Sequence, residues 1–281
     1  INKAIKRIIK AIDNKEKIGI YTDFDADGVS GCALLGNFFQ YLKVEFCAYI
    51  PSREEGYGFS KGGIDYLIRQ GCNLIITVDL GITGKEGVDY AREKQVDVIV
   101  TDHHLYQKDK LPTKALAIIH PELSKEYLNN YLSGGGVAFK LIQAVADKLG
   151  KPNKHQLKWF LDLVAISTVC DMMPLNGENR TMVKYGIEVL TKTKNLGLAA
   201  IIKTASIDPD NISTYTIGFQ IGPRINAPGR MKHAGDSYRL LISRNKKEVR
   251  ELAQELNQIN IQRQEELQMV SEAARVKIKR E

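Results

Sequence analysis

Short apolar runs alternate with helical patterns in the N-terminal part of the chain, and this alternation constrains the fold more than any other feature. Each run has the length and β-branched content of a buried strand, and each is followed by a segment of helical or loop character. The runs are KIGIYTDF, VEFCAYI, CNLIITVD, VDVIVTD and ALAIIHP. Strands joined by helical crossovers form a parallel sheet with both faces covered. We therefore expect an α/β fold with a five-stranded, mainly parallel sheet.

The β pattern stops after about residue 135, and helical patterns follow from GGVAFKLIQAVADKLG to LGLAAIIKTA. The tail from residue 246 contains neither Pro nor Gly and mixes charges of both signs, which predicts one long, solvated helix. We expect an α/β domain over residues 1–190, a helical extension over 191–243 and a connecting helix over 244–281.

Composition narrows the class of protein. Hydrophobic residues make up 43% of the chain, enough for a core, and no apolar window is long enough to span a membrane. The four cysteines are scattered and no signal peptide is visible, which favours a cytoplasmic protein with reduced thiols. The net charge of +7 is compatible with a polyanionic partner. We expect the protein to be monomeric. We also expect this chain to be part of a longer protein, because it begins with Ile1 rather than Met.

The stretch YTDFDADGVSG resembles the start of a calcium-binding EF-hand loop. Asp23, Asp25 and Asp27 alternate and a glycine follows. An EF-hand closes with a bidentate glutamate at its twelfth position, which here is Leu34, and a helix precedes it, whereas here a strand does. The pattern disfavours a calcium loop and leaves another metal site, or an acidic turn in which Asp27 caps a helix.

Acidic residues also end two other predicted strands. Asp79 closes one strand, and Asp102 closes another and is followed by His103 and His104. Ligands of open parallel sheets bind beyond the carboxyl ends of the strands, so these side chains are expected to converge. Carboxylates with an imidazole favour manganese or another first-row ion, and several carboxylates can hold two cations about 3.5–4 Å apart. The alternative for the His pair is a helix start or a core position.

Four motifs in a fixed order carry a family resemblance. DFDADG, VDLG, TDHH and TVCDMMPLNGENR resemble the DHH phosphoesterase family, and GYGFS, SGGGVAFK and GPRINAPGRM are similar to its RecJ branch. RecJ-like enzymes degrade single-stranded DNA from the 5′ end. The resemblance extends over nearly the whole chain, and it implies two divalent cations, Mn²⁺ first and Mg²⁺ as the alternative.

The resemblance also implies roles for single residues. Asp79 would bridge the two cations, His104 would face the scissile phosphate, and Asp102 would orient His103 or His104. The other implied cation ligands are Asp25, Asp27, His103 and Asp171. The implied phosphate-binding residues are Arg224, Asn226, Gly135 and Gly136, and Arg53 and Tyr57 would bind the 5′ end.

Two departures from the family pattern bear on function. DHH pyrophosphatases place a His where this chain has Tyr21, which makes a pyrophosphatase less favoured and leaves Asp23 as a substitute ligand. RecJ-like enzymes continue beyond the long helix into a DHH-associated domain and often an OB-fold, so we expect this chain to be truncated before that domain. Protein partners such as a single-strand-binding protein or a helicase cannot be read from the sequence.

Three functions compete. The favoured one is a two-metal-ion 5′→3′ exonuclease that acts on single-stranded DNA in repair and recombination. A second is a phosphodiesterase for short oligonucleotides or cyclic dinucleotides, which needs the same acids and a closed pocket. A third is a binding scaffold that keeps the fold and has lost the chemistry, and it predicts that ligands are missing.

Overall fold

Five strands form one parallel sheet in the computed structural model, which describes residues 1–124 and 126–278. The strands are β1 (Lys17–Thr22), β2 (Phe46–Tyr49), β3 (Cys72–Val78), β4 (Asp97–Thr101) and β5 (Ala117–Ile119). They are ordered β2-β1-β3-β4-β5, and every neighbouring pair is parallel. The predicted five-stranded α/β fold is therefore confirmed, and the sheet is parallel throughout.

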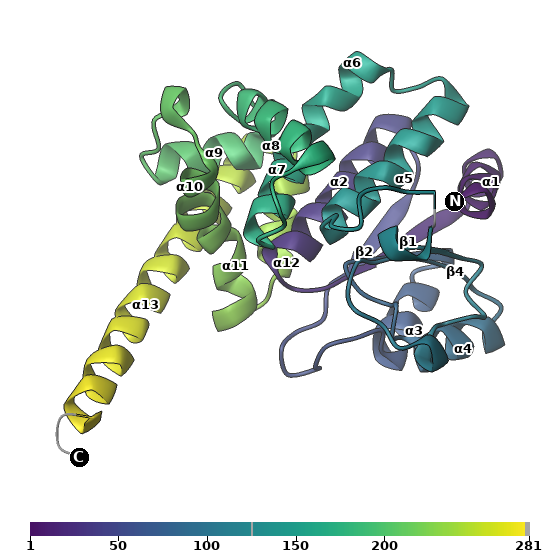
Figure 1. The fold of residues 1–281 in the computed structure, drawn as a ribbon, viewed down its shortest axis with the longest axis horizontal. Coiled ribbons are helices and arrows are strands. Elements are labelled where there is room, and N and C mark those ends of the chain that lie inside the picture. The colour runs from purple at the N-terminus through teal and green to yellow at the C-terminus, as the bar shows by residue number, and fades with distance from the viewer. Residues whose placement is uncertain (125, 279–281) are drawn as a thin grey trace.

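Helices cover both faces of the sheet, as Figure 1 shows. One face carries α1 (Asn2–Asp13), α2 (Ala26–Leu42) and α5 (Gly134–Leu149), and the other carries α3 (Lys61–Arg69) and α4 (Lys85–Glu93). Side chains along β3 alternate between the two cores, because Leu74 and Ile76 join the first and Ile75 joins the second. Since both faces are buried, the strands read as continuous apolar runs.

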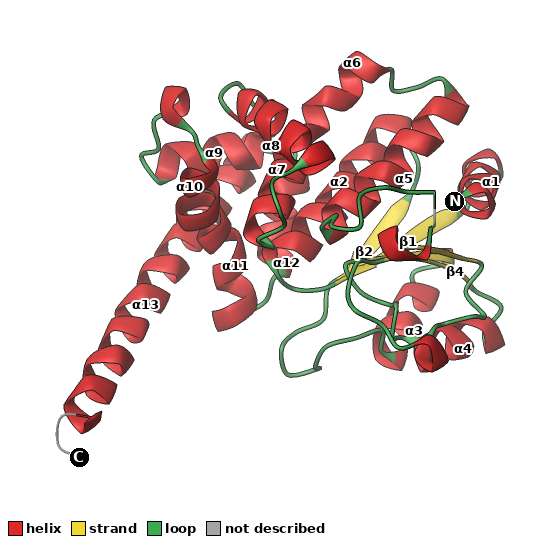
Figure 2. Ribbon diagram, viewed as in Figure 1, coloured by secondary structure: helices red, strands yellow, loops and turns green. Residues whose placement is uncertain are grey.

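The rest of the chain is helical, as predicted (Figure 2). The helices are α6 (Lys154–Leu157), α7 (Leu161–Cys170), α8 (Gly177–Leu190), α9 (Leu196–Thr204), α10 (Thr214–Thr216), α11 (Gly222–Met231), α12 (Gly235–Ile242) and α13 (Lys246–Ile278). A π-helical turn over Ile217–Ile221 joins α10 to α11. Helix α7 packs against α2 and α8 and is buried on most sides. The domain boundaries at residues 190 and 243 stay predictions.

Helix α13 confirms the predicted long C-terminal helix. Its first turns pack against α9 and α11 through buried residues such as Leu252 and Leu256. Beyond Ile261 its described side chains are mostly exposed, and the helix extends away from the other elements (Figure 1). Within the described residues, no helix combines the length and the apolar character that a membrane crossing requires.

One buried carboxylate in the helical part has a pH-dependent energetic cost. Asp162 lies in the first turn of α7, is 2% exposed, and accepts hydrogen bonds from Leu163 N (2.7 Å) and Thr193 Oγ1 (2.6 Å). Burial raises its pKa to about 6, and the two hydrogen bonds only partly oppose that rise. Because the folded pKa exceeds the unfolded one, ionised Asp162 destabilises the fold above about pH 6, and this cost disappears as pH falls below the unfolded value near 4.

We predict that Asp162→Asn stabilises the protein at pH 7.5 by on the order of 1–3 kcal/mol and that the gain vanishes by about pH 4. An amide can still accept from Leu163 N and can donate to Thr193, so the contacts are retained. Urea unfolding of both proteins between pH 4 and 8 measures the difference. Asp13→Asn, at an exposed position, is the control. A stability difference that does not change with pH would contradict the assignment.

Candidate metal centre

The acidic turn after β1 divides its aspartates between two tasks. Asp25 is the N-cap of α2, where its Oδ1 accepts hydrogen bonds from Asp27 N and Gly28 N, both at 2.9 Å. Asp27 is therefore not the cap. It is 1% exposed, and it accepts hydrogen bonds from Gly134 N (2.7 Å), Gly135 N (2.8 Å) and Ser167 Oγ (2.5 Å). One carboxylate thus joins the first turn of α2 to α5 and α7.

Asp79 ends β3 in an unusual backbone conformation. Its φ of 60° lies in the left-handed region of backbone conformation, which residues other than glycine rarely adopt. Its side chain is buried. The N-terminus of α5 packs against it so closely that a Cβ on Gly134 would overlap the Asp79 side chain. The end of β3 and the start of α5 therefore hold the Asp79 carboxylate beside Asp27.

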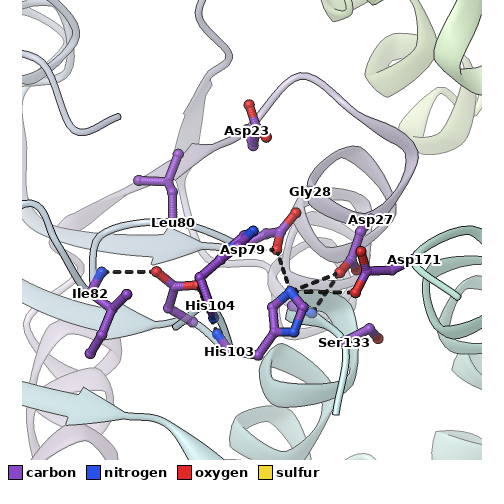
Figure 3. Close-up of polar contacts among 12 residues, drawn as sticks. Asp23, Asp27, Gly28, Asp79, Leu80, Ile82, His103, His104, Ser133 and Asp171 are labelled. Atoms are coloured by element: carbon purple, nitrogen blue, oxygen red, sulfur yellow. Dashed lines mark hydrogen bonds and ion pairs between the residues drawn. The ribbon is translucent and has the colours of Figure 1, made fainter. Parts of the chain in front are cut away.

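His103 lies at the centre of the carboxylates. Its Nε2 is 3.1 Å from Asp79 Oδ1, 3.5 Å from Asp171 Oδ2 and 3.7 Å from Asp27 Oδ2 (Figure 3). Asp171 follows the last residue of α7, so three segments far apart in sequence bring carboxylates to one imidazole. Asp171 Oδ2 is buried and has no hydrogen-bond partner within residues 1–124 and 126–278.

Asp102 orients His104. Its Oδ1 is 2.8 Å from His104 Nδ1 and also accepts the backbone N–H of His103 at 2.7 Å, while its Oδ2 accepts Ile82 N at 2.8 Å. His120 Nε2 donates to the backbone carbonyl of His104 at 2.9 Å. With Nδ1–H bound to Asp102, His104 keeps Nε2 available for a ligand.

Three overlapping groups of side chains have the spacing of metal ligands. The groups are Asp23–Asp25–Asp79, Asp27–His103–Asp171 and Asp79–His103–His104, each with ligand atoms within 4.8 Å of one another. Asp79 belongs to two of them, which is the arrangement expected of a bridging ligand. The structure thus brings together the predicted ligands, and it places Asp23 with Asp25.

The charges of this cluster are unbalanced without cations. Burial, followed by repulsion from neighbouring aspartates, raises the pKa of Asp27 and Asp79 well above the ordinary value. The same two causes raise the pKa of Asp23 and of Asp171 to about 6. Divalent cations would remove this repulsion and could be bound by Oδ2 of Asp171, which has no hydrogen-bond partner among the described residues. The oxygen and imidazole donors of the cluster therefore fit divalent cations.

The two histidines have opposite shifts. Burial and the neighbouring His104 lower the pKa of His103 to about 4, which keeps its imidazole neutral and able to bind a metal. The hydrogen bond to Asp102 raises the pKa of His104. Burial opposes ionisation of Asp102, but its bonds to His104 and to Ile82 N outweigh that effect and lower its pKa. Asp102 and His104 thus each favour the charged form of the other.

The residues expected to bind phosphate have contacts of their own. Asn226 Oδ1 accepts Ala26 N at 2.6 Å, which ties α11 to the start of α2. Arg224 donates from Nε to Asn257 Oδ1 (2.9 Å) and from Nη1 to Gln220 O (2.7 Å). These contacts leave the phosphate-binding roles of both residues as predictions.

The backbone N–H groups of Gly135 and Gly136, which were expected to bind phosphate, already donate hydrogen bonds within the protein. Gly135 N donates to Asp27, and Gly136 N donates to Ser133 Oγ at 3.1 Å. A direct N–H contact to phosphate would require these bonds to break. The geometry instead gives Gly135 the task of holding a carboxylate.

The residues expected at the 5′ end lie in one loop. Tyr57 OH is 3.5 Å from His104 Nδ1, and the Tyr57 ring meets the His104 ring edge to face at 6.0 Å. Arg53 is exposed, donates from Nε to Gly229 O at 2.7 Å, and lies over the Phe24 ring at 4.8 Å. The loop therefore reaches the candidate metal centre, and Arg53 contacts the end of α11.

Sequence reasoning missed Ser133 and Ser167, which belong to the hydrogen-bond network around Asp27. Ser133 could have been noticed, because a serine before three glycines at a helix start is an N-cap pattern. Ser167 carries no local signal, since it lies inside an apolar helix and meets Asp27 only through the packing of α7 on α2.

A parallel sheet whose strand ends carry such a cluster defines an α/β protein with a candidate metal centre, and comparison with known proteins specifies the family. Residues 17–168, more than half of the chain, match the model described as "DHH family, N-terminal domain". The chain therefore belongs to the DHH family. Within this family it is similar to RecJ exonucleases.

Curated relatives extend the similarity over almost the entire chain. The "Single-stranded-DNA-specific exonuclease RecJ" of Bacillus subtilis is 39% identical over 98% of this chain, and that of Escherichia coli is 36% identical over 94%. A crystal structure of exonuclease RecJ bound to manganese matches with a TM-score of 0.85 at 33% identity, over 93% of this chain and 65% of that one. RecJ of Thermus thermophilus in complex with Mn²⁺ matches with a TM-score of 0.80 at 31% identity, over 93% of this chain and 37% of that one. This chain spans 34% of the Bacillus subtilis protein and 48% of the Escherichia coli protein.

The close contact at Gly134 gives a test of the cluster. Gly134→Ala places a methyl group against the Asp79 side chain, so we predict loss of measurable Mn²⁺ binding while the fold is retained. Gly62→Ala, in a helix with open space around the glycine, is the control and should bind Mn²⁺ as the wild type does. Calorimetric titration with circular dichroism measures both properties. Equal Mn²⁺ binding by the two variants would refute the packing argument.

Proposed function

We propose that this chain is the catalytic core of a cytoplasmic, two-metal-ion 5′→3′ exonuclease that hydrolyses single-stranded DNA in repair and recombination. The observation that carries the proposal is the position of Asp79, which forms one ligand group with Asp23 and Asp25 and whose Oδ1 also lies 3.1 Å from Nε2 of His103, because a shared carboxylate is what two adjacent cations require. The names of the similar RecJ proteins, and the manganese and magnesium in their crystal structures, support the substrate and the metal.

Two sets of ligands follow from the geometry. Asp25 and Asp79, with Asp23, would hold one cation, and Asp27, His103 and Asp171 would hold the other. Asp79 is the proposed bridge, because its Oδ1 lies 3.1 Å from Nε2 of His103. When bound, such cations lower the pKa of a water molecule and neutralise charge on a phosphate under in-line attack. The protein contributes the spacing, through the bonds of Asp27 to α5 and α7.

His104 has a role of its own. Its Nδ1–H is donated to Asp102, and the raised pKa favours the imidazolium form, in which Nε2–H is a second donor. Such a donor beside the cluster can stabilise negative charge on the reacting phosphate. Tyr57, next to His104, closes one side of this position.

The DNA strand would follow basic and polar groups of α11 and the adjacent loop. Arg224 and Asn226 are the proposed phosphate contacts there, and the net charge of +7 favours a polyanion. The scaffold alternative predicts missing ligands, and every proposed ligand is present. A phosphodiesterase for short oligonucleotides or cyclic dinucleotides would use the same ligands. Only an assay with different substrates can therefore distinguish it from the exonuclease.

Substitution of the bridge tests the chemistry. Asp79→Ala should lower hydrolysis by about a thousandfold or more and should reduce Mn²⁺ binding below two ions, because both cations lose a shared ligand. The assay follows 5′-labelled single-stranded DNA with Mn²⁺ beside duplex DNA and a cyclic dinucleotide. Asp147→Ala, on the exposed side of α5, is the control. Near-wild-type turnover by Asp79→Ala would remove the two-metal assignment, and preferred cleavage of the cyclic dinucleotide would select the alternative function.

Arg53 tests the direction of degradation. A guanidinium can bind a terminal phosphate through two charged hydrogen bonds, worth about 1.5–3 kcal/mol, so Arg53→Ala should reduce the preference for 5′-phosphate over 5′-hydroxyl ends by about tenfold or more. Mn²⁺ binding should stay unchanged. Arg69→Ala, at an exposed position on α3, is the control. If the rate ratio of the two ends is the same in wild type and Arg53→Ala, the contact with Gly229 is the structural role of Arg53.

A further inference from the structure

Asn179 is a buried amide that joins two loops beside the candidate metal centre. It lies in the first turn of α8 and is 0% exposed. Its Nδ2 donates to Tyr131 O at 2.5 Å and to Pro174 O at 3.1 Å, and its Oδ1 accepts Asn129 Nδ2 at 3.2 Å. Burial of an amide costs free energy unless the amide is hydrogen-bonded. The hydrogen-bond partners of Asn179 all lie outside its own helix.

The first loop leads to the groups that hold Asp27. Tyr131 is two residues before Ser133, whose hydroxyl caps α5 and shares a 2.6 Å hydrogen bond with Ser167 Oγ. Gly134 and Gly135 follow and donate their N–H groups to Asp27. The position of the Tyr131 carbonyl therefore sets where this donor pair begins.

The second loop leads away from Asp171. Asp171 is the C-cap of α7. The next residue, Met172, has a φ of 55°, and Pro174 lies three residues beyond Asp171. Asp171 Oδ2 accepts no hydrogen bond from the part of the chain that the structure describes. Its direction is thus set by its backbone, and Asn179 anchors that backbone at Pro174.

We propose that Asn179 is a positioning residue that fixes the distance between Asp27 and Asp171 and so forms the cation site of Asp27, His103 and Asp171. The proposal rests on the proposed two-cation function. Among the described residues, Asn179 makes no hydrogen bond to a proposed ligand side chain. It acts through the carbonyls of Tyr131 and Pro174, and such outer contacts typically change metal affinity about 10–100-fold.

The chain contains a matched control. Asn37, in α2, is 8% exposed, donates from Nδ2 to Ala33 O (2.8 Å) and Leu241 O (3.3 Å), and accepts Arg244 Nη2 at 2.9 Å. Like Asn179, it donates two hydrogen bonds to backbone carbonyls and accepts one from a side chain, here a charged one, but it lies about 15 Å along α2 from Asp27. Truncation at either position should cost similar stability, so only a positioning role distinguishes them.

The experiment compares Asn179→Ala, Asn37→Ala and wild type by calorimetric Mn²⁺ titration, well below each unfolding midpoint. We expect Asn179→Ala to bind one ion as wild type does and the second about tenfold more weakly or worse. Asn37→Ala should bind both as wild type does. In metal-free protein, amide hydrogen exchange should rise in residues 129–135 and 171–176 of Asn179→Ala only. Asn129→Ala, which removes a single bond, should shift the second affinity in the same direction by less.

The outcomes separate this proposal from the function on which it rests. Wild-type affinity for both ions in Asn179→Ala overturns the positioning role and leaves the two-cation function intact. An equal loss in Asn37→Ala also overturns it, because general destabilisation then explains the effect. If Asn179→Ala does not fold, unchanged second-ion affinity and unchanged exchange in Asn129→Ala overturn it. A wild type that binds fewer than two ions overturns the two-cation function itself.

Discussion

The carboxylate of Asp27 is the contact on which the centre of the molecule depends. It receives two N–H groups from the start of α5 and a hydroxyl from α7, while its own backbone begins α2. Burial of a charge is expensive unless hydrogen bonds or opposite charges compensate it. Three donors supply part of that compensation, and the raised pKa of Asp27 shows that burial and the neighbouring aspartates outweigh it. The packing of three helices and the charge imbalance of the site therefore have one origin.

That imbalance connects stability to metal binding. Three aspartates, Asp27, Asp79 and Asp171, surround the neutral imidazole of His103 and repel one another, and a divalent cation between them would convert repulsion into attraction. Because a ligand that binds only the folded state stabilises it, the centre and the fold are thermodynamically linked. Asp102 and His104 lie at the edge of the same cluster and carry the opposite arrangement, in which a carboxylate and an imidazole stabilise each other's charge. The aspartates around His103 thus require added positive charge, whereas Asp102 and His104 compensate each other's charge.

Most of the fold and of the acidic cluster could be predicted, for a local reason. A buried parallel strand is a short apolar run, and the residue that ends it is the next polar one, so Asp79 and Asp102 were recognisable from their neighbours. Asp171 was recognised only through family resemblance, because it follows a helix and nothing around it marks a ligand. Ser167 and Asn179 were missed, since each is a common polar residue whose partners lie in other segments of the chain. The helix cap, which was the alternative role for Asp27, is formed by Asp25, a difference that depends on where the first turn of α2 begins.

The sequence by itself determined the strands, the helices and the acids at the strand ends, because these depend on periodicity and on short-range order along the chain. The tertiary structure alone decided which acids lie close enough together to form a candidate cation site, since that depends on strand order β2-β1-β3-β4-β5 and on how closely Gly134 lets α5 approach Asp79. It also decided that the Gly135 N–H holds a carboxylate and that a buried amide in α8 ties two loops together. Hydrogen bonds between distant segments leave no periodic trace in a sequence, and only the packed chain brings their partners within reach.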